Sequence, residues 1–556
     1  MTSAHTQGGS PSTRDVVICG GGLAGLLLAR QLRQQLPALS VAVIERIERP
    51  LPDGCVKVGE SSVELGSQHL ESLGLTEYLL ERQLVKLGLR FFPGGGALPL
   101  HERTEIGPCA EPVVRSYQLD RGRFENDLRA MAEADGVLMV EGSKVTTIEF
   151  GAGDADHAIT YEGRQNGTLM ARWVVDATGR QALLRKRMKL TRGAPHVASS
   201  GWFRVRGRVD INDLVPRSET EWHSRPVANE RWRSTNHLMG TGYWAWVIPL
   251  STGMTSIGLV IHEEIHDPSC IAGLDNVLAF LAEHEPHLHG LLQGYPVEDF
   301  LCLRKYSHTI ARAWSEDRWA MVGEAGAFVD PLYSPGTDFI TLANRFTTEL
   351  IRTWHEGGEV QKKATQLNHH YRAFVTGTLD LFRRAAPVYG HPTAMATKVF
   401  WDNFSYWSFT CHFSQQHLYR LSQEEYEPFA AIGRRFLELG NLMQGFLRHW
   451  ALLAPEAQRP EFIGAPHYPS ILIDAHVRVG EKMTLEETLE HFRTRIVQAE
   501  EIAGEIVLRT VLHLGPDLGR QLLQESEFAT WGIRIAPERI ETETKTGHAR
   551  RTRLST

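Results

Sequence analysis

The sequence predicts an α/β fold in which a parallel sheet is assembled from distant segments and is followed by a helical C-terminal region. Strand–turn–helix patterns recur near residues 20, 175 and 325. A β-rich stretch with alternating apolar residues separates them, and beyond about residue 340 helical periodicity dominates. A chain of 556 residues also exceeds one ordinary hydrophobic core, so two or three domains are expected.

The first strand–turn–helix pattern is "DVVICGGGLAGLLLARQL" (15–32), and a second strand, "VAVIERI" (41–47), follows it. The glycines have the GxGxxG spacing, in which a tight turn lets the backbone approach a pyrophosphate at the positive end of a helix. Glu45 lies 20 residues after Gly25, where a carboxylate accepts a hydrogen bond from a ribose hydroxyl. The predicted cofactor contacts of this segment are Gly20, Gly22, Leu23, Ala24, Gly25, Glu45 and Arg46.

Three further segments indicate FAD rather than NAD. "VVDATGR" (174–180) and "VGEAGAFVDP" (322–331) resemble motifs of FAD enzymes of the glutathione reductase and hydroxylase type, and "YQLDRGRFENDL" (117–128) resembles their arginine-containing helix start. The second motif usually carries Asp where this chain has Glu324. Either arginine of the helix start could instead belong to a capped surface helix. The cofactor residues that this resemblance implies are Arg121, Arg123, Asp176, Gly179, Glu324 and Asp330.

The β-rich part contains "GYWAWVIPL" (242–250), with two tryptophans one residue apart. Side chains alternate along a strand, so Trp244 and Trp246 are expected on the same face, and Pro249 should end the pairing or mark an edge. Taken alone, the pair fits two core aromatics of a half-buried strand. The neighbouring stretches "VTTIEF", "SGWFRVRGRV" and "TSIGLVI" have a similar alternation.

Four motifs together resemble the flavin-dependent halogenases, over roughly residues 15 to 420. "WAWVIP" has their WxWxIP form, and "KVGESS" (57–62) is similar to their flavin strap, with Val58, Gly59 and Glu60 as cofactor contacts. "VKLGLRFF" (85–92) places Lys86 where the phenol- and pyrrole-type members carry a catalytic lysine. "VDPLYSPG" (329–336) lies at their halide and flavin loop, which implies halide contacts at Ser334, Pro335, Gly336 and Thr337.

The resemblance implies a fold and a mechanism. The fold is a glutathione-reductase-type, Rossmann-like FAD domain (15–200 and 300–345) with an inserted β-rich substrate segment (200–300) and a helical C-terminal region (346–540). FADH2, O2 and chloride or bromide would give hypohalous acid, and the Trp244/Trp246 wall would keep the substrate away from the flavin. Lys86 would hydrogen-bond hypohalous acid or trap it as a haloamine and present the halogen to an electron-rich ring.

Lys86 also has a structural interpretation, as a solvated partner of Glu77 or Glu81, and Lys57 beside the strap is a competing candidate. Tryptophan halogenases hold their substrate with a glutamate where this chain has Tyr333, so phenol-like, resorcinol-like, polyene or carrier-bound rings are favoured over free tryptophan. Pro335 lacks an N–H, which leaves the Gly336 amide and the Ser334 or Thr337 hydroxyl as halide donors.

Two other functions stay open at this point. One is an FAD-dependent monooxygenase that hydroxylates or epoxidises. The other is a flavin-binding pseudoenzyme, which is supported by the departures from the family motifs at Glu324 and Pro335. No second GxGxxG is present, which fits reduction of the flavin by a separate reductase, but single-component hydroxylases also lack one.

Composition and residue spacing argue against several other classes of protein. A net charge of −7 argues against nucleic acid, and no apolar run reaches the roughly 18 residues of a membrane span. Six scattered cysteines without a CxxC pair fit reduced thiols in a cytoplasmic protein, and no histidine spacing predicts a metal. Residues 1–14 and 541–556 are expected to be disordered tails. The aromatic run "FWDNFSYWSFTCHF" (400–413) predicts either helical core or the lining of a substrate pocket.

Overall fold

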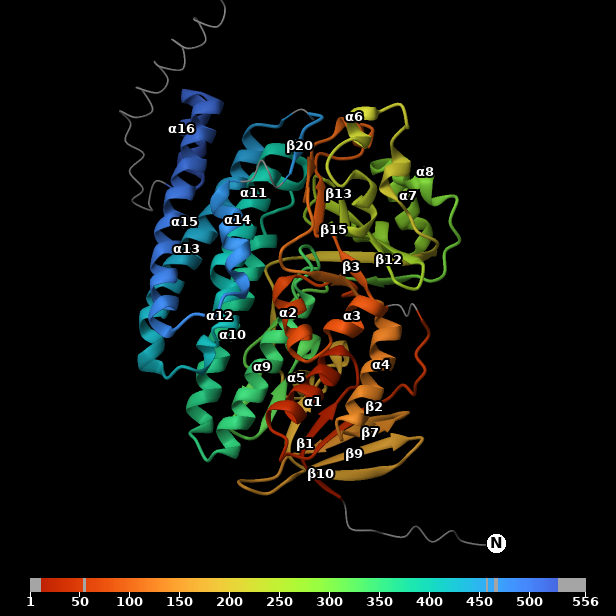
Figure 1. Cartoon of the computed structure of the whole chain (residues 1–556), viewed down its shortest axis with the longest axis vertical. Helices are drawn as coiled ribbons and strands as arrows, with labels where there is room; N and C mark the ends of the chain where they lie inside the picture. The colour runs from red at the N-terminus through yellow and green to blue at the C-terminus, as the bar shows by residue number, and fades with distance from the viewer. Residues whose placement is uncertain (1–11, 54–56, 457–458, 465–468, 529–556) are drawn as a thin grey trace, which may run out of the picture.

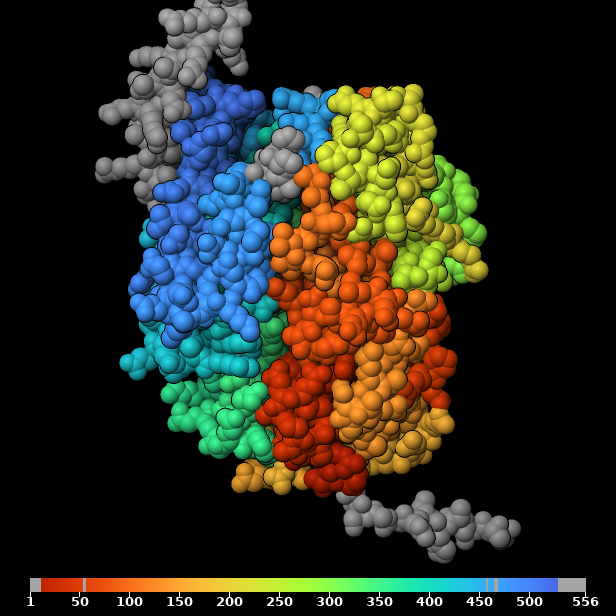
Figure 2. Space-filling model, in the orientation of Figure 1, coloured from red at the N-terminus to blue at the C-terminus, as the bar shows by residue number. Residues whose placement is uncertain are grey.

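A computed structural model describes residues 12–53, 57–456, 459–464 and 469–528. Three parts are visible in Figure 1: a parallel sheet with its helices, a second sheet with its own helices, and a bundle of long C-terminal helices that runs beside both. Figure 2 shows this bundle along one side of the molecule. The predicted tails lie outside the described residues, except that the first strand already begins at Thr13.

The parallel sheet is built from segments far apart in the chain, as the sequence predicts. Its path runs β18 (Trp314–Ser315), β19 (Trp319–Met321), β10 (Gly167–Asp176), β1 (Thr13–Cys19), β2 (Val41–Glu45) and β7 (Leu138–Glu141). Strands β19, β10, β1, β2 and β7 are parallel, with Cys19 beside both Asp176 and Ile44. Their carboxyl ends therefore meet at one edge, where the glycine turn leads into α1 (Leu23–Gln35). The start of β10 pairs antiparallel with β9 (His157–Gly163), which continues to β8 (Ser143–Glu149).

The second sheet takes strands from before, within and after the β-rich segment. Its order is β16 (Leu301–Leu303), β12 (Ala198–Arg206), β15 (Met254–His262), β14 (Tyr243–Pro249), β13 (Thr235–Gly240), β4 (Leu89–Phe92), β5 (Glu105–Ile106) and β20 (Phe462–Ile463). Just before β4, a short ribbon pairs β3 (Leu84–Lys86) with β6 (Ser116–Gln118). Residues near position 90 and position 460 thus share one sheet with the insertion.

The prediction that the tryptophans lie on a half-buried strand is wrong, because all seven residues of β14 are buried. The alternation separates two cores rather than core from solvent. Tyr243, Ala245 and Val247 pack into a core that includes α7 (Leu274–His284), whereas Trp244, Trp246 and Ile248 belong to the larger core of the molecule. As expected, the strand ends at Pro249.

The C-terminal bundle is helical, with the two-residue strand β20 as an exception. Its helices are α9 (Gly336–His355), α10 (Val360–Phe382), α11 (Pro392–Ser405), α12 (Cys411–Gln415), α13 (Gln423–Leu453), α14 (Ser470–Val477), α15 (Leu485–Leu514) and α16 (Pro516–Glu525). Both α13 and α15 begin with a capping box, Ser422 with Glu425 and Thr484 with Glu487. In the described part of the chain, no helix is long and apolar enough to cross a membrane.

Candidate active site

A cavity of about 640 Å³ lies at the carboxyl edge of the parallel sheet. This first cavity is the place where an open α/β sheet binds its ligand. It brings together most of the predicted cofactor and halide residues: Gly20, Gly22, Leu23, Ala24, Glu45, Arg46, Val58, Gly59, Glu60, Arg121, Gly179, Glu324, Asp330, Ser334, Pro335, Gly336 and Thr337.

The glycine turn is shaped for close backbone approach. Gly20 has φ +115°, and a Cβ there would lie 2.4 Å from the Ala177 carbonyl oxygen. A Cβ on Gly25 would lie 2.0 Å from the Gly20 oxygen, so Gly25 serves helix–strand packing and does not line the cavity. Gly22 differs, because its φ of −84° suits any residue and a Cβ would meet nothing closer than a Glu125 oxygen at 4.0 Å. Its missing side chain leaves space for a ligand.

Glu45 lies at the end of β2 and faces the turn. Its carboxylate accepts hydrogen bonds from the Gly21 amide at 2.7 Å and the Ile47 amide at 2.9 Å. Each oxygen keeps acceptor capacity for a ribose hydroxyl. Glu45 therefore lies at the end of the second strand beside the glycine turn, and its contact with a ribose stays a prediction.

The first part of the strap, residues 57–60, is held by the start of α4 (Arg121–Ala134). Arg121 donates to the Val58 carbonyl at 2.8 Å and to Glu125 at 2.6 Å, and Lys57 also pairs with Glu125. Burial would raise the pKa of Glu125, but Arg121 and Lys57 outweigh it and hold that pKa below its usual range. Lys57 is therefore engaged in fixing the strap.

Besides Gly25, two predicted contacts lie outside the first cavity. Arg123 donates to the Ser251 hydroxyl at 3.4 Å and does not line the cavity, because a position two residues after Arg121 lies on a different face of α4. Asp176 is buried behind the turn, where it accepts from the Thr178 amide at 3.0 Å and the Leu184 amide at 2.7 Å. It shapes the "VVDATGR" turn without facing the cavity. Arg180, which the prediction omitted, does line it, and burial lowers the pKa of its guanidinium.

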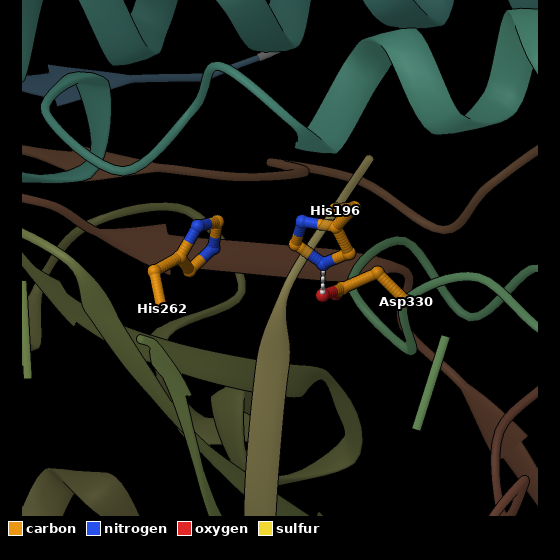
Figure 3. A group of neighbouring side chains, drawn as sticks. All are labelled: His196, His262 and Asp330. Carbon is orange, nitrogen blue, oxygen red and sulfur yellow. Dashed lines mark hydrogen bonds and ion pairs between the residues drawn. The ribbon is translucent and has the colours of Figure 1, made fainter. Parts of the chain in front are cut away.

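Asp330 reaches the cavity from a buried polar cluster. Figure 3 shows His196 pointing its Nε2 at the Asp330 carboxylate, at 2.7 Å, with His262 beside them. Tyr306 donates to the same oxygen at 2.8 Å, and the Leu332 amide donates to the other at 2.9 Å. These hydrogen bonds anchor the loop that follows, so Asp330 positions residues 331–337 as well as lining the cavity.

The tryptophan pair forms part of the wall of the first cavity. Trp244 and Trp246 are 1% and 4% exposed, and their rings lie 5.6 Å apart. The Trp246 indole covers Gly258, where a Cβ would lie 2.1 Å from the ring, and its Nε1 donates to Ser256. Trp244 Nε1 has no hydrogen-bond partner among the described residues, which suits a wall that faces a polar ligand.

The predicted halide loop has a strained backbone. Tyr333 and Ser334 have φ of +66° and +58°, a region that residues other than glycine rarely adopt. Pro335 then caps α9, whose first amide, on Gly336, has no acceptor within the helix. Thr337 Oγ1 is buried without a hydrogen-bond partner in the described chain. A helix start with an unused amide and an unused hydroxyl fits an anion.

A second cavity, of about 560 Å³, adjoins the halide loop and contains Lys86. Pro335 lines both cavities, whereas Ser334 and Gly336 face the first and Tyr333 faces the second. An aromatic row accompanies this junction: the Trp244 ring lies 5.5 Å from His237, which stacks on Phe91 of the second cavity at 4.7 Å. The tryptophan wall and the lysine are thus in different chambers that meet at the loop.

Lys86 is fully buried at the end of β3. Its ammonium donates to the Ser61 hydroxyl at 2.9 Å and the Ser62 carbonyl at 2.8 Å, in the last two residues of the strap. Burial lowers its pKa to about 7, although the charges of Glu64 and Asp338 oppose the shift. The solvated pairing with Glu77 or Glu81 is therefore wrong, because the strand turns the side chain inward.

The aromatic run divides between core and cavity. Phe404 and Cys411 are buried in the helical core, while Trp401 and Trp407 line the second cavity. A π-helical segment, Tyr406–Thr410, interrupts the regular helical period, so the aromatic side chains of the run do not share one helical face. The same cavity is lined by three side chains from separate helices that were not predicted from the sequence: Glu64, Asp338 and His476. Only Asp338 carried a signal, since it lies two residues beyond the halide loop.

Known proteins of one family are similar to this chain. The sequence model of the family described as tryptophan halogenase matches residues 15–96 and 100–436. The flavin-dependent halogenase chlA of Dictyostelium discoideum is 28% identical over 436 residues, covering 71% of this chain and 69% of the relative. The 1H-pyrrole-2-carbonyl peptidyl-carrier-protein chlorinase of Pseudomonas fluorescens is 25% identical over 346 residues, covering 58% of this chain and 72% of that protein.

The fold is shared with solved halogenase structures. The crystal structure of halogenase PltM superposes with a TM-score of 0.63 at 15% identity, covering 88% of this chain and 96% of PltM. A second PltM structure, in complex with phloroglucinol and FAD, has a TM-score of 0.62, and the same shares of the two chains are covered. The chain therefore belongs to the tryptophan halogenase family and is a flavin-dependent oxidoreductase with FAD, halide and O2 as its cofactors.

Proposed function

We propose that this enzyme uses FADH2 to make hypohalous acid in the first cavity and delivers its halogen through Lys86 to an electron-rich aromatic ring in the second. The observation that carries the proposal is the pair of cavities that meet at Pro335, with the tryptophans on one side and the lysine on the other. A hydroxylase needs its ring beside the flavin, whereas this arrangement separates the two.

The first cavity offers the groups that would hold the cofactor. The glycine turn and the start of α1 would receive the pyrophosphate, Glu45 the ribose, and the strap the isoalloxazine side. Unused polar atoms, among them Trp244 Nε1 and Thr337 Oγ1, fit a polar ligand and a halide. Bound FADH2 supplies the reducing equivalents with which O2 and halide give hypohalous acid.

Lys86 is prepared for either form of its proposed role. Ser61 and Ser62 fix its nitrogen, and a pKa of about 7 makes both ammonium and amine available near neutral pH. The ammonium would hydrogen-bond hypohalous acid, and the amine would trap the halogen as a haloamine. Its position on the far side of the halide loop supports delivery rather than formation of the acid.

The second cavity supports an aromatic substrate. Aromatic side chains, including Phe91, Tyr333, Trp401 and Trp407, supply much of its wall. Tyr333 stands where a glutamate would hold free tryptophan, so we propose a phenolic, resorcinol-like, polyene or carrier-bound ring. Two related proteins support this range of rings. PltM has been solved in complex with phloroglucinol, and the pyrrole chlorinase is named for a ring on a peptidyl carrier protein. We also propose that a separate flavin reductase in the cytoplasm supplies the FADH2.

The test supplies the purified enzyme with FADH2 from a separate flavin reductase, bromide or chloride, and phloroglucinol as the probe ring. Mass spectrometry should show halogen in the product, in the isotope pattern of the halide added. Product that gains oxygen and never halogen would assign the chain to the monooxygenases. Bound FADH2 that is not reoxidised would indicate a pseudoenzyme.

A further inference from the structure

We propose that Asp338 is the base that removes the proton from the ring carbon after halogen transfer, and that Tyr406 positions it. The inference rests on the proposed function and adds a residue to it. Asp338 lines the second cavity together with Lys86, and it lies two residues beyond Gly336 of the halide loop. The carboxylate is therefore close to the junction through which the halogen arrives.

Asp338 is 2% exposed and fixed on both oxygens. Oδ1 accepts from the Gly66 amide at 2.9 Å, and Oδ2 accepts from the Tyr406 hydroxyl at 2.7 Å. A carboxylate has about four lone-pair sites, so two such bonds leave acceptor capacity toward the cavity that it lines. Asp402 of the same cavity contrasts with it, because Lys398, Gln444 and Tyr333 all bind its oxygens.

Tyr406 owes its place to the π-helical segment. Its hydroxyl donates to Asp338 and accepts from the Leu65 amide at 3.1 Å, so its direction is fixed from both sides. The extra residue in a π turn lets the chain place Tyr406 and Trp407 along the cavity while Phe404 and Cys411 stay in the core. Such turns occur frequently at functional sites.

The charged, titratable and hydrogen-bonding groups around Asp338 come from several elements. Glu64 and Gly66 belong to α2 (Glu64–Ser72), Lys86 to β3, and Tyr406 and Cys411 to the helical bundle, while His476 of α14 pairs with Glu64 at 3.2 Å. Burial raises the pKa of Asp338 to about 7, with Glu64 adding to the rise and Tyr406, Gly66 and Lys86 opposing it. Near neutral pH the group can both take and return a proton.

The proposed step balances. The ring carbon bonds to the halogen of hypohalous acid, the oxygen–halogen bond breaks with its electron pair on oxygen, and the Lys86 ammonium gives that oxygen a proton to form water. The carbon–hydrogen bond then breaks, its electron pair restores the aromatic ring, and the proton goes to the Asp338 carboxylate. Asp338 finally returns a proton to the Lys86 amine. The sum converts the ring and hypohalous acid into halogenated ring and water.

The test compares Asp338→Asn with Asp127→Asn. Asp127 on α4 likewise accepts a tyrosine hydrogen bond, from Tyr78 at 2.7 Å, but lines neither cavity. With phloroglucinol and bromide, Asp338→Asn should lower kcat about 100-fold or more, the usual range for a lost general base, while hypohalous acid caught by a soluble diketone trap is unchanged. Asp127→Asn should keep both rates.

Tyr406→Phe separates a base from a structural carboxylate. Its hydroxyl lowers the pKa of Asp338, so its removal raises that pKa and should move the acidic limb of the kcat profile to higher pH. An unmoved limb, or Asp338→Asn with kcat within twofold of the native enzyme, overturns the inference while the proposed function stands. A native enzyme that halogenates no ring removes both.

Discussion

Replacing Lys86 with Met tests whether the fold holds this lysine at a lowered pKa. The buried side chain has a pKa of about 7, against 10.5 for an ordinary lysine. Between these values the unfolded chain binds more protons than the native one, so the free energy of unfolding rises with pH. Below pH 7 both states carry the proton and the whole penalty is present. Met has a similar shape and no charge, so it removes this dependence.

The size of the effect follows from the pKa difference of roughly 3.5 units, at 1.36 kcal/mol per unit. From pH 8 to pH 10 the native enzyme should gain about 2.5 kcal/mol in unfolding free energy from this one group. Asp338, whose pKa is raised to about 7, is ionised across that window and adds little slope. This change in unfolding free energy is large enough to be distinguished from the contributions of other titrating groups.

The assay is urea unfolding followed by tryptophan fluorescence at pH 8, 9 and 10, for the native enzyme and Lys86→Met. The difference between the two isolates Lys86, because from pH 8 upward the native Lys86 is mostly uncharged and leaves the neighbouring groups as they are in Lys86→Met. Lys144, exposed on β8, provides the control, and Lys144→Met should keep the native pH dependence. Parallel curves for the native enzyme and Lys86→Met would refute the lowered pKa.

Four further substitutions test the first cavity. Gly22→Val should fold normally, since the position has φ −84° and room for a side chain. It should weaken FAD binding by about 10- to 100-fold, because phosphate contacts are lost, as measured by flavin fluorescence titration. Native affinity for FAD would contradict the cofactor site. Trp246→Ala, and Gly258→Ala, which forces the indole away, should keep FAD but release more peroxide or hypohalous acid per product; unchanged coupling would return the pair to plain core packing. Thr337→Val should raise the halide KM about 10-fold or more, with kcat for FADH2 oxidation unaffected, and an unmoved KM would exclude that hydroxyl.

Local motifs were predictable because they carry their own geometry. The glycine turn with Glu45, the strap, and the loop at 334–337 all depend on neighbours in the chain, and the structure gathers them at one cavity. Arg123 shows the limit of this reasoning. It lies two residues from Arg121 in the same helix start, but helical rotation directs it to Ser251.

Long-range contacts were not predictable from one sequence. In the sequence, Gly66 lies 272 residues from Asp338 and Tyr406 lies 68 residues from it, and only the folded chain brings them into contact. The π-helical segment breaks the period that would have assigned the aromatic run to one face. The prediction of a half-buried tryptophan strand was wrong for another reason. Alternation between two cores gives the same sequence pattern as alternation between core and solvent.

The most direct test of delivery through Lys86 is the product formed by Lys86→Ala with FADH2, bromide or chloride, and phloroglucinol. Lys57→Ala serves as the comparison, since Lys57 binds Glu125 beside the strap and its loss should disturb flavin handling first. Lys86→Ala should still oxidise FADH2 and release hypohalous acid to a trap, yet give no halogenated ring by mass spectrometry. Lys86→Arg should not rescue it, because a guanidinium stays protonated and is a poor nucleophile. Full halogenation by Lys86→Ala would remove this lysine from the mechanism.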